Sequence, residues 1–406
     1  MGQTFSNVDS ALKEDYKPVI REQLNDKALF LSQIDKNTES IEGRRAVLSI
    51  HTSRNEGVGA RRDGVALPTA GNEGFAEERI PVMHNYGSLE LSGPAMRAMK
   101  SDKGSFTRTL QYATKGVTNT LKLDVNRQAF GDGTGAIAET TVSTTGQTTV
   151  LLAAATTTAQ MRQFRPGMAV DIGTLAELNA GSGGPTYNNI IVSVSVSGKS
   201  FVLTSNLGSA TASGDFVSRA GAGGALGGST QKEITGLEAI IAASGALHNV
   251  TDASWVSTVN TTGGTPTENL FARVMHDVQI ASGEDITMIV TSDDVHRNYA
   301  NNLTSQKRFS NTIELHGGYK SIDVAAGGGS VPLVWDRDCR NGIAYFLNPS
   351  HLVQFEQTDW EWLDDDGSVL HQVAGFDKFA AVLYKDHELA TDMRCAFGKA
   401  TGLTGA

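Results

Sequence analysis

A long segment from His51 to Arg97 constrains this chain most, because it is punctuated by glycine, carries several arginines and shows no helical periodicity. Loops of this length are uncommon inside a compact domain and are usually functional. Short alternating apolar runs, at Ile80 and Val82 and again at Leu89 and Leu91, predict the two strands of an extended hairpin. Such a hairpin has few residues with which to form a core of its own. We therefore predict that it lies on a neighbouring copy of the same protein.

The composition fits a subunit whose surface is partly covered by protein. Only 19% of the residues are charged, and glycine makes up 44 of the 406 residues, well above the usual share of about 7%. The formal net charge of −10 argues against a protein that grips nucleic acid through counterion release. Residues 1–131 carry 18 Lys and Arg against 16 Asp and Glu, whereas the remainder carries 16 against 28. A basic segment facing an acidic body suits docking between subunits, but solvated charges without any partner would give the same counts.

The extended segment also supplies the predicted contact residues, which are arginines and large apolar side chains. The candidates for contact with a neighbouring subunit are Arg54, Arg61, Arg62, Leu67, Phe75 and Arg79.

Several motifs imitate functional sites, but each has a simpler interpretation. The glycine-rich runs that begin at Gly57 and Gly131 resemble phosphate-binding loops, yet neither follows a strand and opens a helix. The cluster Asp364–Asp366 lacks the alternate-residue spacing of an EF-hand, so a β-turn explains it better than a cation site. The nine histidines form no HExxH motif, and no GxSxG elbow is present. We therefore predict no catalytic residue, no cofactor and no metal, and a protein that is not an enzyme.

The cysteines and the hydrophobic runs indicate where the chain is made. Cys339 and Cys395 are too few for a disulfide framework and too far apart for a zinc ribbon, so we expect reduced core thiols. No apolar run approaches the ~20 residues that a membrane span needs, and the first 18 residues lack a signal-peptide stretch. We expect synthesis and assembly inside a cell, without a membrane partner.

Helical periodicity marks two segments in the first third of the chain. A helix is predicted from Pro18 to Ile34, since proline is favoured at a first helical position. A second is predicted from Ser105 to Phe130, with an apolar stripe and Gly131 as its stop. At 1.5 Å per residue it would be roughly 39 Å long, which suits a structural spine against a sheet. Between the two helices, residues 46–50 read as a short strand.

The composition changes abruptly between Glu139 and Arg219, where only eight residues are charged and Ser, Thr, Gly and Ala dominate. Alternating apolar residues there predict a small all-β insertion. Its strands are expected near 148–152, 168–172, 189–196, 200–204 and 215–218. A glycine-rich stretch over 221–228 reads as a flexible return linker.

The remainder of the chain alternates helices and strands, which predicts an α+β body. The helices are expected near 233–243, 267–281 and 293–303, the last of them capped by Ser292 and Asp293. The strands are expected at 286–291, 331–335, 343–347, 352–356, 369–373 and 380–384.

The order of these features resembles that of tailed-bacteriophage major capsid proteins, whose fold is called Hong Kong 97-type. The resemblance rests on YGSLELSG from Tyr86, on the spine helix ending in RQAFGDGTG from Arg127, and on the segment Val331–Leu352. The sequences QTDWEWLDDDGSVL and KDHELATDMRCAFGKATGL resemble the end of the same family. Together these motifs cover residues 10–135 and 230–403. Each motif alone is weak, but their joint order is more specific.

The resemblance implies an α+β chain with six parts. These are an amino-terminal arm (1–50), an extended loop (51–97), a peripheral domain with the spine helix (98–138), an inserted β domain (139–220), an axial domain (221–350), and the return strands of the peripheral domain with the carboxy terminus (351–406). The insertion departs from many members of the family. No long helical scaffolding segment precedes the arm, which implies a separate scaffolding protein.

The implied function is a self-assembling subunit of hexamers and pentamers, which close into an icosahedral shell around double-stranded DNA. The implied partners are other copies of the chain, a scaffolding protein, a portal, a possible decoration protein, and DNA bound without sequence specificity. The implied location is the virion, after assembly in the host cytoplasm. Two alternatives stay open. One is a nanocompartment shell around an enzyme cargo, and the other is a multidomain hydrolase using Asp364–Asp366 and a histidine, which would be a monomer or a small oligomer.

The sequence predicts a shell that is not covalently cross-linked through its loop. Some members of the resembled family join a loop lysine to an asparagine of a neighbour, which requires an amine nucleophile. No lysine occurs between Lys36 and Lys100, and the guanidinium of arginine stays protonated. Mature particles boiled in detergent should therefore run as one band near the 43.0 kDa monomer. A ladder of multimers that survives boiling and reductant would contradict this prediction.

Overall fold

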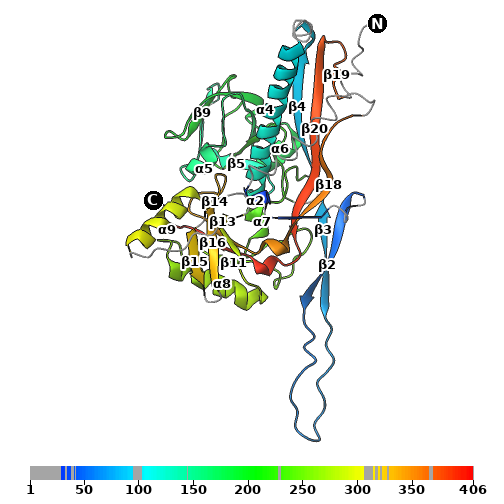
Figure 1. The fold of residues 1–406 in the computed structure, drawn as a ribbon, viewed down its shortest axis with the longest axis vertical. Coiled ribbons are helices and arrows are strands. Elements are labelled where there is room, and N and C mark those ends of the chain that lie inside the picture. Colours follow the sequence, from blue (N-terminus) through cyan, green and yellow to red (C-terminus); the bar gives the residue numbers. More distant parts are fainter. Residues whose placement is uncertain are drawn as a thin grey trace.

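The computed structural model describes residues 29–32, 34–37, 41, 43–94, 103–143, 145–226, 230–305, 314–315, 319–320, 322–326, 329–364 and 369–405. Figure 1 shows a body of helices and sheets from which one long hairpin projects. The predicted helix over 18–34 lies mostly outside the described residues, which include only α2 (Leu29–Ser32) from its end. Residues 365–366 of the aspartate cluster also lie outside them.

A five-stranded sheet and the spine helix form the upper part of the body in Figure 1. The sheet contains β1 (Asp35–Asn37), β18 (Leu352–Trp362), β20 (Lys378–Thr391), β19 (His371–Gln372) and β4 (Met83–Ser92). The helix α4 (Lys103–Ala129) confirms the predicted spine and lies against β4. At Gly87 of β4 an added Cβ would lie 2.5 Å from the Leu121 Cδ1 atom. The absence of a side chain at Gly87 therefore lets the helix approach the strand closely.

A six-stranded mixed sheet forms the lower part of the body. Its strands are β11 (Thr258–Asn260), β21 (Gly398–Ala400), β17 (Ala344–Leu347), β12 (Met288–Thr291), β16 (Gly329–Trp335) and β15 (Ile322–Ala326). The helices α8 (Glu268–Ser282) and α9 (Asp293–Ser305) cover it and confirm the predictions at 267–281 and 293–303. Phe271, Tyr299 and Phe346 pack between the helices and the sheet. Further short elements are β13 (Glu314–Leu315), β14 (Tyr319–Lys320) and the 3-10 turns η1 (Pro349–His351) and η2 (Arg394–Ala396).

The helix predicted over 233–243 is wrong in length, because only one turn forms, α7 (Leu237–Ile240). The fully buried Arg394 explains the early end of this helix. Its guanidinium donates to the carbonyl oxygens of Ala239 (3.0 Å), Ile240 (2.7 Å) and Gly245 (2.8 Å). A side chain thus satisfies acceptors that a longer helix would have paired with its own backbone.

The inserted region has a six-stranded sheet of its own, with strands in the order β5 (Ala136–Glu139), β10 (Phe216–Arg219), β7 (Ala169–Gly173), β8 (Thr186–Ser195), β9 (Ser200–Leu203) and β6 (Thr149–Leu151). The five strands predicted for this region are all present. The sequence did not indicate β5 or two short helices, α5 (Thr158–Met161) and α6 (Leu175–Ala180), each opened by a threonine capping box. The core of the region is drawn from residues within 137–217. Because β5 pairs antiparallel with β10, the chain enters and leaves the insertion side by side.

The projecting hairpin consists of β2 (Arg45–Ser53) and β3 (Gly74–Pro81), which pair from Arg45 opposite Pro81 to Ser53 opposite Gly74. The predicted pairing of the run at Ile80 with the run at Leu89 is wrong. Both runs form strands, but β4 pairs with β20, where Leu89 lies opposite Ala381. Between β3 and β4 the chain passes from the hairpin to the five-stranded sheet of the body. It does so because β20 offers β4 a long partner strand. Residues 83–92 of the predicted extended loop are thus part of the body.

We predict that the insertion can be excised. Gly135 and Ala222 already lie side by side, since a Cβ on Gly135 would be 2.5 Å from the Ala222 carbonyl oxygen. Replacing residues 136–221 with two glycines should leave the body folded, as judged by circular dichroism and protease resistance. The excision removes Arg219, whose Nε atom lies 2.8 Å from an Asp124 carboxylate oxygen.

Asp124 then shares Arg127 with the buried Glu233, which leaves an excess negative charge. Asp124 keeps its hydrogen bonds from Arg127 and Gln128, so the loss is that of one hydrogen bond to a charged group, about 1.5–3 kcal/mol. The excised protein should therefore be less stable in urea than the full chain, and adding Asp124→Asn should restore part of the loss. Aggregation of both variants would mean that the body needs the insertion in order to fold.

Candidate subunit interface on the projecting hairpin

The tip of the hairpin, which we define as residues 54–73, has no regular secondary structure and is almost entirely exposed. Its apolar side chains include Val58, Val65 and Leu67, with Leu67 83% exposed. None of the five hydrophobic clusters formed by the described residues contains a residue of the tip. Contact with the main core ends at Ile50 and Ala76. Among the described residues, the apolar side chains of the tip therefore belong to no hydrophobic cluster of the subunit.

The tip is organised by one side chain at its neck. The Asn55 Oδ1 atom accepts hydrogen bonds from the backbone N–H groups of Gly57 (2.8 Å) and Gly71 (3.1 Å). At Gly71 an added Cβ would lie 2.6 Å from that oxygen, so the clamp requires glycine. For the described residues of the tip, backbone-to-backbone bonding is limited to the Val65 N–H and the Arg62 carbonyl oxygen (3.3 Å). The backbone beyond the neck is thus available to an external partner.

The structure places the predicted contact residues in two groups. Four of them, Arg54, Arg61, Arg62 and Leu67, lie in the exposed tip, and Phe75 follows at the start of β3, where it is 69% exposed. The sixth, Arg79, lies apart, near the body, and pairs with Glu77 at 3.1 Å. Val58 and Val65, which were not among the predicted contact residues, are also exposed on the tip; the signal for them was an apolar residue in a segment without periodicity.

The root of the hairpin is held by a carboxylate on an apolar face. The inner face of the ribbon carries Ala46, Ile50 and Ile80, which are buried. Glu78 shares that face and is 0% exposed, with its Oε1 atom 2.8 Å from the Nδ1 atom of His248. The backbone N–H of Arg79 also donates to the His248 carbonyl oxygen at 2.7 Å. The sequence contained no signal that would join residues 78 and 248.

The His248 turn continues this network into the body. His248 and Asn249 both adopt positive φ angles, +45° and +77°, in a tight turn bridged by Leu247 and Val250. The Nε2 atom of His248 lies 3.2 Å from the Thr235 hydroxyl oxygen. The Thr235 backbone N–H donates to the Glu388 carboxylate of β20 at 2.5 Å. The hairpin is therefore connected to β20 of the five-stranded sheet through a chain of buried polar groups, which runs from Glu78 through His248 and Thr235 to Glu388.

Burial controls the protonation of these carboxylates. Burial raises the pKa of Glu388 to about 7, although the charge of His248 and the N–H groups of Thr235 and Leu389 oppose this shift. Burial also raises the pKa of Glu78, against the hydrogen bond and charge of His248. The His248 imidazole thus contacts the Glu78 carboxylate directly and acts on the Glu388 carboxylate through its charge.

Other kinds of site receive little support in the described part of the chain. No group of three His, Cys, Asp or Glu side chains there could hold a metal ion, and no helix is long and apolar enough to cross a membrane. Cys339 and Cys395 are both free thiols; Cys339 lies in the core as expected, whereas Cys395 is only half-buried, and burial raises the pKa of each.

Comparisons with known proteins give a structural likeness without a likeness in sequence. No protein-family model matches the chain, and no curated protein matches it. A chain of the cyanophage A-1(L) capsid asymmetric unit has a TM-score of 0.55 at 11% sequence identity, covering 93% of both chains. The chain has a viral capsid fold. This confirms the α+β, Hong Kong 97-type architecture expected from the sequence.

Two further solved structures are similar to the chain at lower scores. One is the SrpI encapsulin complex from Synechococcus elongatus PCC 7942, with 9% identity, a TM-score of 0.46 and coverage of 93% of this chain and 88% of that one. The other is the capsid of Myoviridae phage XM1, with 10% identity, a TM-score of 0.44 and coverage of 93% and 92%.

The raised pKa of Glu388 predicts a pH-dependent stability. In the pH range between 4.5 and about 7 the native state holds a proton that the unfolded state releases. The contribution of Glu388 is therefore full below pH 4.5 and is lost as the pH rises through about 7. Glu388→Gln keeps an acceptor for the Thr235 and Leu389 N–H groups and cannot ionise. Its free energy of unfolding in urea should exceed that of the wild type by about 1–3 kcal/mol at pH 8, and the difference should shrink toward pH 5.

The matched control is Glu90→Gln, which removes an exposed carboxylate paired with Lys378 at 2.8 Å. Exposed pairs contribute little, so this variant should follow the wild type at both pH values. If the free energies of unfolding of Glu388→Gln and the wild type differed by the same amount at pH 5 and pH 8, the raised pKa of Glu388 would be contradicted.

Proposed function

We propose that this chain is the major capsid protein of a tailed bacteriophage, a structural subunit without catalytic activity. The observation that supports this most strongly is an exposed, coreless hairpin tip on a body that shares its fold with a chain of the cyanophage A-1(L) capsid. A two-stranded ribbon is at best marginally stable alone in water. A ribbon whose tip belongs to none of the hydrophobic clusters of the described residues gains a packing partner when a neighbouring subunit supplies the surface.

The asymmetry of the hairpin supports a ring-forming contact. The tip presents exposed apolar side chains and arginines, and the surface that receives it must differ from the tip itself. Such head-to-tail contacts generate closed rings when the rotation between subunits closes. We propose that hexamers and pentamers form in this way and close into an icosahedral shell around double-stranded DNA, held without sequence specificity.

The finer parts of the proposal concern partners and location. A separate scaffolding protein would set the size of a shell that the chain can close by itself, a portal would occupy one vertex, and a decoration protein would have the inserted domain as one available surface. Assembly would take place in the host cytoplasm, and the mature protein would reside in the virion.

The test is removal of the tip without disturbing the root. Ser53 and Gly74 are the last paired residues, so replacing residues 54–73 with Asn-Gly should close the ribbon with a two-residue turn. We expect a soluble subunit with wild-type circular dichroism and unfolding midpoint, because the tip contributes nothing to the described cores. Negative-stain microscopy should show closed particles for the wild type and none for this variant. Normal particles from the variant would contradict the proposal.

A matched pair of point variants separates the tip from general surface hydrophobicity. Leu67 and Ile280 are 83% and 84% exposed, on the tip and on α8 respectively. Leu67→Ser should lower the yield of particles relative to the wild type. Ile280→Ser should lower it less.

A further inference from the structure

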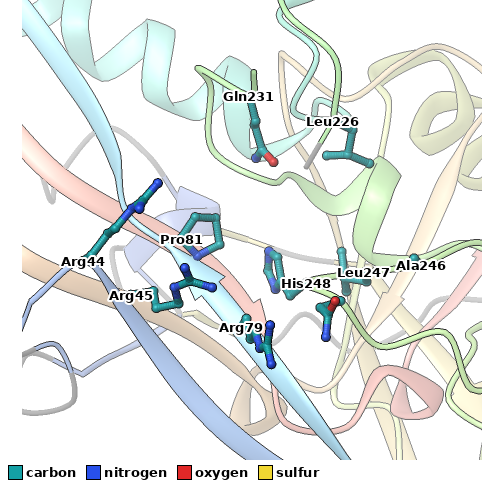
Figure 2. A pocket seen from close by; sticks show the side chains of 10 residues that line it. Arg44, Arg45, Arg79, Pro81, Leu226, Gln231, Ala246, Leu247 and His248 are labelled. Atoms are coloured by element: carbon teal, nitrogen blue, oxygen red, sulfur yellow. The ribbon is translucent and has the colours of Figure 1, made fainter. Parts of the chain in front are cut away.

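A cavity of about 450 Å³ lies at the root of the hairpin, where the ribbon meets the loops of the body. The hairpin side contributes Arg44, Arg45, Arg79 and Pro81. Figure 2 shows the body side, formed by Leu226, Gln231 and the 246–249 turn with His248. None of the residues that line this root pocket belongs to the tip.

The root pocket concentrates positive charge. Three arginines line it, and arginine stays protonated at any physiological pH. Glu77 pairs with Arg79 at 3.1 Å, whereas the neighbouring Glu78 is turned into the body, toward His248. Among the described residues, neither Arg44 nor Arg45 has an acidic partner. The pocket is therefore prepared for an anionic group that the subunit itself does not provide.

The walls of the root pocket define the ligand further. Pro81, Leu226 and Leu247 contribute apolar surface, and Leu226 is 42% exposed. A guanidinium binds a carboxylate through two parallel hydrogen bonds. The apolar walls suit the aliphatic part of the Asp or Glu side chain that carries this carboxylate. The continuous phosphate backbone of a duplex would need an open groove instead. The net charge of −10 also disfavours nucleic acid as the occupant.

We propose that the root pocket receives a carboxylate-bearing segment of a neighbouring copy of this chain, as a second subunit contact beside the tip. Residues 132–406 carry 28 acidic against 16 basic residues, so an adjacent body offers complementary charge. The pocket lies at one end of the ribbon that carries the tip at its other end. Together the two contacts fix both ends of the hairpin. This inference rests on the proposed assembly function.

The test reverses the charge of the pocket. Arg44 and Arg45 are exposed, so Arg44→Glu with Arg45→Glu should melt at the wild-type temperature. In nuclease-treated, DNA-free protein at low salt we expect its yield of closed shells to fall at least tenfold. Arg44→Lys with Arg45→Lys keeps the charge without the fork and should assemble at an intermediate yield. If the double reversal lowers the melting temperature, Arg44→Gln with Arg45→Gln replaces it.

The matched control is Arg273→Glu on α8, which changes a 70% exposed arginine that does not line the pocket and should assemble as the wild type does. A second readout is arginine modification by phenylglyoxal, mapped by mass spectrometry. Arg44 and Arg45 should react in dissociated subunits and be protected in shells, whereas Arg273 should react in both.

These experiments distinguish failure of the root-pocket contact from failure of the proposed function. Failure of the wild type to form shells would contradict the proposed function itself. If the wild type forms shells, the Arg44→Glu, Arg45→Glu variant assembles as well as the wild type, and Arg44 and Arg45 still react with phenylglyoxal in wild-type shells, only the root-pocket contact would be overturned. A defect that appears only when DNA is present would assign the pocket to phosphate, and would equally overturn the contact between subunits.

Discussion

The contact between Glu78 and His248 is the interaction on which the position of the hairpin depends. It puts a carboxylate that is 0% exposed on the otherwise apolar inner face of the ribbon, 2.8 Å from the imidazole. Breaking a buried pair by removing one partner leaves an uncompensated polar group, which is far more costly than losing an exposed pair. The ribbon is therefore held firmly where it leaves the body, and its tip is free to contact something else.

The rest of the body provides a rigid base for that root. The spine helix ends in a buried ionic cluster, in which Arg127 joins Asp124 and Glu233. Arg394 donates to three carbonyl oxygens just before the 247–250 turn that carries His248. The insertion has a hydrophobic core of its own, formed by residues within 137–217, and none of the residues at the root belongs to it. Rigidity at the root and exposure at the tip are what an extended intersubunit contact requires.

Local patterns predicted the local structures well. The apolar stripe from Phe106 to Val125 predicts α4, and alternation in the insertion predicts five of its six strands, because periodicity records which face is buried. Pairing between distant segments leaves no such record. The alternating run at Leu89 pairs with Ala381, almost 300 residues away, and no local signal distinguishes that partner from Ile80. The exposed tip was predictable from its lack of period, whereas the root pocket was not, because it unites residues 44, 79 and 226–249.

The most direct test of the central claim is amide hydrogen exchange of the tip, compared between dissociated subunits and assembled shells. In the subunit, the amides of residues 54–73 should exchange within seconds, since nearly all of those described lack a backbone partner. In the shell, the account predicts strong protection of the same amides, while those of the buried strand β12 are protected in both states. Equally fast exchange of the tip in subunits and shells would show that no neighbour covers it and would contradict the account.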